Sequence, residues 1–152
     1  MHGQMSHKPI LIIFIPDINE KDLCDIMEII TRYEINGIII SNTTNANREK
    51  LLDIKKNEEG GLSGKPLKSI STEMIKKFYK ESNKKISIIG VGGVDSGQSA
   101  FEKIVSGASV VQLYTGMVYK GPSIVKEIKK ELISILNREG SKNIKEAVGI
   151  KA

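Results

Sequence analysis

The sequence predicts an α/β fold of four consecutive strand–helix units that form a parallel sheet. Short apolar runs of strand length recur along the chain, and each is followed by a segment whose apolar residues return at helical spacing. Strands that alternate with helices are typical of parallel sheets, because each helix returns the chain to the start of the next strand. A doubly wound sheet fits this pattern. So does a piece of a (βα)8 barrel, which usually takes about 250 residues, and four units would make half of one.

The first two strands follow from continuous apolar runs. Residues 11–15 are all apolar and end at Pro16, so they predict a buried strand of the kind found in parallel sheets. Helical spacing predicts a helix over residues 20–33. A second β-branched run predicts a buried strand over residues 37–41. Cys24, the single cysteine, falls within the helical apolar pattern and is expected to pack there.

The third and fourth units follow a polar stretch that runs from residue 42 to about 70. Such long connections are usually functional. Ser71 or Thr72 is expected to cap the next helix. The remaining elements are expected to be strands at 86–90 and 110–114 and helices at 98–106, 122–138 and 143–148.

Composition and charge indicate one globular domain. The chain has 152 residues, and no apolar run approaches the roughly 18–20 residues of a membrane span. Its net charge of +5 comes mostly from lysines at polar helix positions without interleaved aromatic residues, so we expect solvated helix faces and no nucleic-acid partner. Residues 1–8 are tag-like, which leaves 9–152 as the domain. His2 and His7 lie in that start without a carboxylate cluster, so no metal site is expected.

The polar residues that suggest a binding site follow the predicted strands. Parallel barrels build their sites at the carboxyl ends of the strands. Gly92 and Gly93 follow the third strand, and glycines there allow backbone N–H groups to approach a phosphate. Asn42 and Thr43 follow the second strand and could bind a small polar ring with a carboxylate. On spacing alone, both pairs fit ordinary turns equally well.

Five ordered motifs carry a family resemblance. They are Ser-Asn-Thr-Thr (41–44), Gly-Gly-Leu-Ser-Gly-Lys-Pro-Leu (60–67), Ile-Ile-Gly-Val-Gly-Gly-Val (88–94), Gly-Ala-Ser-Val-Val-Gln-Leu-Tyr-Thr (107–115) and Gly-Pro (121–122). In this order and spacing they resemble the C-terminal half of class 2, quinone-linked dihydroorotate dehydrogenases, and the match runs from about residue 8 to 149.

The resemblance implies a (βα)8 barrel that binds FMN and oxidises dihydroorotate to orotate in pyrimidine biosynthesis, with a quinone as electron acceptor. Asn42 and Thr43 match positions that bind the pyrimidine, and Ser41 matches a position that contacts the flavin. The other expected cofactor residues are Ser63, Gly64, Gly92, Gly93, Tyr114 and Thr115, of which Gly93, Tyr114 and Thr115 match positions near the phosphate.

Two departures from the family qualify this expectation. Ile13 stands where the family has a lysine that touches the flavin ring, so the tuning of the flavin is in question. The serine general base and the helices that admit quinone belong to the family's N-terminal half, so no catalytic base is assigned here. We therefore expect the isolated chain to be inactive. The alternatives are a non-catalytic module that binds FMN or another phosphate ligand, and, less favoured by the motifs, half of some other phosphate-binding barrel.

The resemblance also gives expectations about partners and location. A half barrel has two open strand edges, which promote pairing. We therefore expect self-association or pairing with an N-terminal half. The parent protein is expected at the mitochondrial inner membrane if it is eukaryotic and at the cytoplasmic membrane if it is bacterial, whereas this chain itself is expected to be soluble.

Overall fold

The computed structural model describes residues 8–46 and 48–152. Most of the expected tag-like segment, including His2 and His7, lies outside the described residues. Four strands make up the sheet: β1 (Leu11–Phe14), β2 (Gly37–Ile40), β3 (Ser87–Gly90) and β4 (Val110–Val111). The main connecting helices are α1 (Glu20–Arg32), α2 (Lys68–Glu81) and α3 (Gly97–Val105), as predicted within a few residues.

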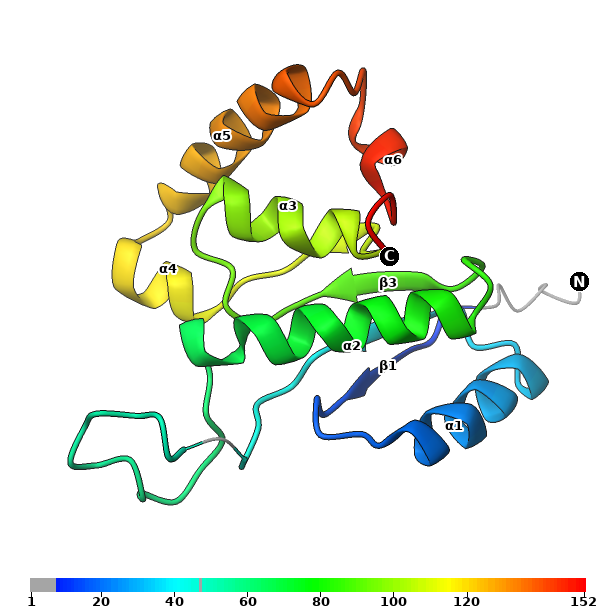
Figure 1. Ribbon diagram of the computed structural model, residues 1–152, viewed down its shortest axis with the longest axis horizontal. Helices are drawn as coiled ribbons and strands as arrows, with labels where there is room; N and C mark the ends of the chain where they lie inside the picture. The colour runs from blue at the N-terminus through cyan, green and yellow to red at the C-terminus, as the bar shows by residue number, and fades with distance from the viewer. Residues whose placement is uncertain (1–7, 47) are drawn as a thin grey trace, which may run out of the picture.

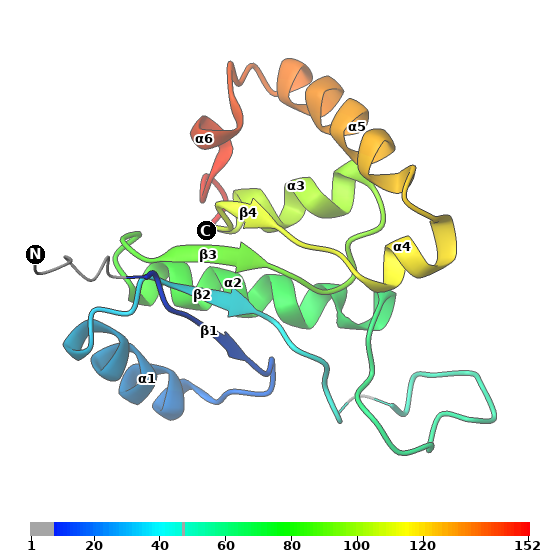
Figure 2. The same cartoon turned by 180° about the vertical axis from the view of Figure 1, so that it is seen from behind.

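The order of the strands decides between the two predicted architectures. The sheet runs β1-β2-β3-β4, and every neighbouring pair is parallel. Right-handed crossovers between consecutive neighbours place all the connecting helices on one face, and in Figure 2 the strands lie in front of α2. A doubly wound sheet would need a reversal of strand order and helices on both faces. The sheet is therefore of the barrel type.

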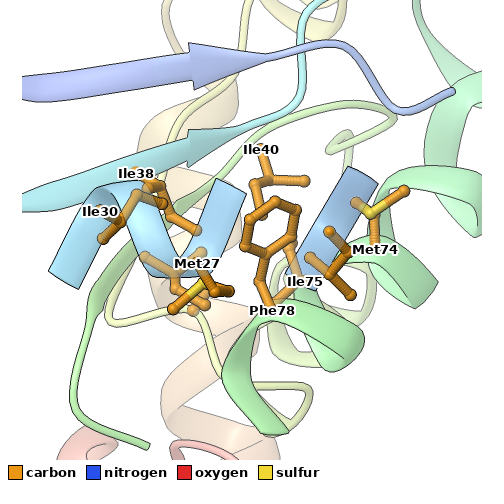
Figure 3. Close-up of a cluster of buried hydrophobic side chains, with 10 residues drawn as sticks. Met27, Ile30, Ile38, Ile40, Met74, Ile75 and Phe78 are labelled. Atoms are coloured by element: carbon orange, nitrogen blue, oxygen red, sulfur yellow. The ribbon is translucent and has the colours of Figure 1, made fainter. Parts of the chain in front are cut away.

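The covered face of the sheet holds the main hydrophobic core. Ile38 and Ile40 on β2 are completely buried, and Phe78 on α2 is buried against them (Figure 3). The stripe of α1 adds Met27 and Ile30 to the same cluster. Burying a side chain of this size contributes roughly 1.5–3 kcal/mol, so this layer fixes the helices to the sheet and holds the ends of the strands in place.

The opposite face of the sheet is largely uncovered. The strand register places Ile13, Ile39, Ile89 and Val110 in one row across it. Ile13 is 52% exposed and Val110 is 56% exposed. The prediction that residues 11–15 are buried was therefore wrong. β1 is an edge strand, and within the described residues no second layer packs on its inner side.

The start of α2 and the end of the chain also differ from the prediction. Neither Ser71 nor Thr72 caps α2, because the 3-10 turn η1 (Lys65–Leu67) leads directly into the helix at Lys68. Pro66, whose fixed φ suits a first helical turn, explains this early start. The fourth strand is shorter than expected.

A short helix, α4 (Thr115–Lys120), was not predicted. It precedes α5 (Ile124–Arg138) and α6 (Ile144–Ala147). Cys24 is exposed, so its expected packing was wrong: the buried stripe of α1 is Leu23, Met27 and Ile30. Among the described residues, no helix is both long and apolar enough to cross a membrane.

Candidate functional site

A cavity of about 890 Å³ lies at the carboxyl ends of the strands. Its size is that of a site for a cofactor or another small molecule. All nine residues expected from the sequence to bind cofactor or substrate line this one cavity. They are Ser41, Asn42, Thr43, Ser63, Gly64, Gly92, Gly93, Tyr114 and Thr115. Ile13 lines it as well.

The end of β2 places a buried hydroxyl group in the cavity wall. Ser41 is 3% exposed, and its Oγ has no hydrogen-bond partner among the described residues. A buried polar atom without a partner costs about 1–3 kcal/mol, so this oxygen suits a hydrogen bond to a bound molecule. Asn42 is exposed, and its Oδ1 accepts a 2.8 Å hydrogen bond from the Thr43 backbone N–H. Because the Asn42 oxygen already accepts this bond, we expect its NH2 group to donate to a bound molecule.

The segment after β2 is anchored from both sides. Thr44 is buried, and its hydroxyl group donates to the Asp17 carboxylate at 2.7 Å. The backbone of Thr44 also pairs with Leu62 in an antiparallel bridge. A Cβ on Gly61 would lie 1.8 Å from Thr43 Oγ1, so only glycine lets the returning loop pass this close. These contacts hold Asn42 and Thr43 beside residues 61–64.

The long connection between β2 and η1 projects from the sheet on the side toward which the strands point (Figures 1 and 2). Its two arms are held together by Arg48, whose guanidinium donates to the backbone oxygens of Lys56, Glu58 and Gly60. Leu52 and Ile54 near its tip are entirely exposed. Only the two ends of this connection, residues 41–43 and 61–64, line the cavity.

The two glycines after β3 make a turn whose backbone conformation and close packing both favour glycine. Gly92 has a φ of 103° and Gly93 a φ of 70°, both in the region that favours glycine. A Cβ on Gly92 would lie 3.0 Å from Leu67 Cδ2. A Cβ on Gly93 would lie 2.5 Å from Lys68 Cβ. The turn therefore rests directly on the first turn of α2, with its backbone on the cavity.

The segment after β4 closes this end of the cavity. The Thr115 hydroxyl group donates to Ser63 Oγ at 3.0 Å. A Cβ on Gly64 would lie 3.1 Å from Thr115 Cγ2, so the two loops are in close contact. Tyr114 is 78% exposed at the rim. The predicted cofactor residues of the three loops are thus brought together.

Three charged residues at the same end were not among the predicted site residues. Lys65 Nζ lies 3.4 Å from Asp95 Oδ2, and Lys120 Nζ donates to the Asp95 backbone oxygen at 2.8 Å. All three residues line the cavity. Lys65 belongs to the Gly-Lys-Pro motif and could have been included. Lys120 lies on α4, so its position required the helix that the sequence did not predict.

The residues present fit a phosphate-bearing flavin. A turn of two glycines whose backbone lines the cavity suits a phosphate, and the two lysines add positive charge beside it. The unpartnered Ser41 Oγ lies in the part of the wall that also holds Ile13 and the Asn42–Thr43 pair. The described residues contain no group of three or more His, Cys, Asp or Glu side chains placed to hold a metal ion.

Comparison with known proteins gives one consistent family. The family model for dihydroorotate dehydrogenase matches residues 1–136. Dihydroorotate dehydrogenase (quinone) from Trichodesmium erythraeum is 45% identical, over 94% of this chain and 40% of its own length. The mitochondrial dihydroorotate dehydrogenase (quinone) of Mus musculus is 43% identical, over 94% of this chain and 36% of its own length.

A solved structure agrees with these relatives. The ligand-free dihydroorotate dehydrogenase from Eimeria tenella superposes with a TM-score of 0.90 at 38% identity, covering 93% of this chain and 39% of that one. This chain therefore spans 36–40% of the length of the two relatives named above. The order of the strands, the presence of helices on one face of the sheet and these matches all indicate the same fold. The chain belongs to the quinone-linked class of the dihydroorotate dehydrogenase family, and its four βα units are the C-terminal half of that family's (βα)8 barrel.

Proposed function

We propose that this chain supplies the FMN-binding half of a quinone-linked dihydroorotate dehydrogenase. The observation that carries the proposal is that one cavity gathers all nine residues at matching cofactor and substrate positions. When bound, FMN supplies the hydride-accepting chemistry that oxidation of dihydroorotate requires.

Each wall of the cavity has a separate task in this proposal. The backbone of Gly92 and Gly93, together with Tyr114 and Thr115, holds the phosphate. The hydrogen bond between Thr115 and Ser63 keeps the loop of residues 60–67 over that end. The buried Ser41 hydroxyl group bonds a polar atom of the flavin and so removes the cost of its missing partner.

The substrate side depends on Asn42 and Thr43. The Asn42 amide donates to a carboxylate or carbonyl oxygen of dihydroorotate, and the Thr43 hydroxyl group fixes the orientation of the ring. Positioning of this kind lowers the barrier by presenting the reacting carbon in the correct geometry. The chain's own residues therefore orient the substrate, whereas the proton acceptor is a serine that the family resemblance places in the other half of the barrel. The isolated chain is expected to bind flavin without turnover.

An absorbance spectrum tests this proposal. The purified chain is incubated with FMN, desalted, and then mixed with dihydroorotate under anaerobic conditions. A retained flavin band that dihydroorotate does not bleach is the expected result. A colourless protein would contradict the cofactor assignment, and steady turnover by the purified chain would contradict the assignment of the base to the other half.

We further propose that the uncovered face of the sheet is closed by four more parallel strands in the working protein. The row of apolar side chains through Ile13 and Val110 supports this, because such surface is rarely left open to water. The strands come from an N-terminal half or from a second copy of the chain. A sharp monomeric boundary in sedimentation velocity would count against self-association. We also propose that the full-length parent works at a membrane that contains quinone, which is the mitochondrial inner membrane if the source is eukaryotic and the cytoplasmic membrane if it is bacterial.

A second candidate function is a flavin- or phosphate-binding module without catalysis. Ile13 favours it, because the family's lysine at that position would stabilise negative charge on the reduced flavin. Adding an N-terminal half from a relative of known activity separates the two candidates. Restored oxidation of dihydroorotate supports the enzyme, and bound FMN without any turnover supports the module.

A further inference from the structure

Lys103 on α3 is a buried cation outside the residues that the family motifs assign to the site. Its exposed fraction is 0%. Its Nζ donates to the Lys68 backbone oxygen at 3.0 Å and to Thr72 Oγ1 at 2.8 Å. Among the described residues, Lys103 forms no ion pair within 4.0 Å. Lysine is almost never fully buried unless it is paired, so its retention beneath this site requires a reason.

The atoms that Lys103 holds belong to the platform under the glycine turn. Lys68 is the first residue of α2, and a Cβ on Gly93 would lie 2.5 Å from Lys68 Cβ and 2.7 Å from its Cα. A Cβ on Gly92 would lie 3.2 Å from Ser71 Cβ in the same helical turn. The Thr72 hydroxyl group also donates to the Lys68 oxygen at 2.7 Å. Any shift of this first turn therefore displaces the glycine turn above it.

The charge of Lys103 depends on its surroundings. Burial lowers its pKa to about 7; Glu102 acts to raise the pKa and Lys68 acts to lower it. These two charged neighbours also form an ion pair, with Lys68 Nζ 3.0 Å from Glu102 Oε2. On the β3 side the neighbour is Gly90, which carries no charge. Near neutral pH the ammonium group is thus poised between its charged and neutral forms.

We propose that Lys103 is a positioning residue for the phosphate of the ligand: its ammonium group fixes the first turn of α2 under Gly92–Gly93 and places a buried positive charge behind that turn. The inference rests on the proposed function, which assigns the turn to the phosphate of FMN. Water and salt screen a buried charge far less than they screen the charge of a surface lysine. It can therefore attract the phosphate without touching it, and a bound phosphate in turn favours the protonated form of Lys103.

The test compares two flavins that differ only in the phosphate. Dissociation constants of the whole chain for FMN and riboflavin are measured by quenching of flavin fluorescence. Lys103→Met keeps the apolar stem but removes the ammonium group. It is expected to weaken FMN binding about tenfold, the equivalent of one pKa unit on Lys103, and to leave riboflavin binding unchanged. Lys80→Met, which removes the same charge from the exposed far end of α2, is the matched control.

The pH profile gives a readout that a purely structural role would not move. In the unmodified chain, the preference for FMN over riboflavin is expected to fall as the pH rises from about 6.5 to about 8.5, because Lys103 loses its proton in this range. The FMN phosphate completes its own ionisation near pH 6, which acts in the opposite direction. In Lys103→Met the fall with rising pH should disappear. An unchanged preference and an unchanged pH profile in this variant would overturn the inference.

A second pair of variants covers the case in which Lys103→Met fails to fold. Thr72→Val removes one of the two acceptors of the ammonium group, and Thr72→Ser keeps it. FMN binding is expected to weaken severalfold in Thr72→Val only, with riboflavin binding equal in both. Equal FMN binding by the two variants would overturn the inference while leaving the proposed function intact. If the unmodified chain binds neither flavin, the proposed function fails and this inference fails with it.

Discussion

The two ends of the cavity are supported very differently. At the end where we propose that the phosphate binds, the loop follows β3, which has a neighbouring strand on each side, and it rests on α2, with Gly92 against the buried Leu67. At the other end, Ile13 lies on the edge strand β1 and is 52% exposed. The proposed phosphate end is thus held by this chain's own core. The end proposed for the flavin ring depends on what covers the open face and on Ile13, which stands where the family has a lysine.

Gly93→Ala is expected to have the largest effect on FMN binding, because it disrupts the glycine turn at the supported end. The new Cβ would lie 2.5 Å from Lys68 Cβ, and the φ of 70° disfavours any residue with a Cβ. We expect FMN affinity to fall roughly 100-fold or more, the scale on which preorganised donors act. Calorimetric titration with FMN measures the change.

Gly140→Ala is the control for backbone strain. Gly140 has a φ of 75°, and an added Cβ would have no neighbour within 4 Å. This variant carries a similar strain without the clash, so its FMN affinity should be unchanged. If both variants lose FMN equally, strain alone explains the loss, and the close packing of Gly93 on α2 is not what holds the turn.

Thr115 offers a smaller test of the same end. Thr115→Ala removes the hydroxyl group that bonds Ser63. Because a hydroxyl group has one proton, Thr115 would donate to the phosphate when FMN is bound, and Ser63 would then donate to Thr115 Oγ1. A hydrogen bond to a charged group contributes about 1.5–3 kcal/mol, which corresponds to a loss of roughly 10- to 100-fold in FMN affinity. Thr115→Ser keeps the hydroxyl group and should bind FMN like the unmodified chain. Equal affinity in the alanine and serine variants would show that the hydroxyl group does not bind the phosphate.

The glycine turn at the supported end was the feature of the candidate site that the sequence could predict. Gly92 and Gly93 directly follow an apolar run, and a turn of this kind is a local feature that neighbouring residues specify. The exposure of Ile13 could not be predicted, because an apolar run does not reveal whether its strand lies at an edge or in the middle of a sheet. Lys120 was missed with the short helix α4, whose six residues leave little periodicity to detect.

Lys103 illustrates a second limit on what the sequence can predict, which is the burial of a charged side chain. In the sequence it is one of the chain's many lysines, on an amphipathic helix, and nothing local distinguishes it from an exposed lysine. It is buried because α2 packs against α3 there, and the two acceptors of its ammonium group, on Lys68 and Thr72, lie more than 30 residues away. Cys24 shows the opposite error. Its position in an apolar pattern predicted that it is buried, but it follows the buried Leu23 by one residue and lies on the exposed side of the helix.

Ile13→Lys sharpens the comparison at the poorly supported end. A cation beside the flavin ring favours the reduced, more negative form over the oxidised form. We expect the midpoint potential of bound FMN to rise by about 30 mV, which corresponds to about 1.4 kcal/mol for a two-electron couple. Ile13→Met, with an unbranched uncharged side chain, is the control. A potential that is the same in both variants would mean that residue 13 does not lie beside the ring.

Ser41→Ala is expected to have the smallest effect on FMN binding, but the sign of its effect on the stability of the free chain is informative. Without ligand, Ser41 Oγ is buried and has no partner among the described residues. Its removal should therefore stabilise the free chain by about 1 kcal/mol. With FMN, the same change should weaken binding about fivefold, since one neutral hydrogen bond is lost. Denaturant unfolding and FMN titration measure the two effects.

Ser71→Ala separates this behaviour from that of an ordinary buried serine. Ser71 is also completely buried, but its hydroxyl group donates to the Val91 backbone oxygen. Its removal leaves an acceptor with one partner fewer, so the free chain should lose stability. If Ser41→Ala also destabilises the free chain, its hydroxyl group already has a partner without ligand, and the argument that it is kept for a bound flavin fails. If Ser41→Ala stabilises the free chain and Ser71→Ala destabilises it, the chain keeps a destabilising hydroxyl group at Ser41 because a bound ligand forms a hydrogen bond with it.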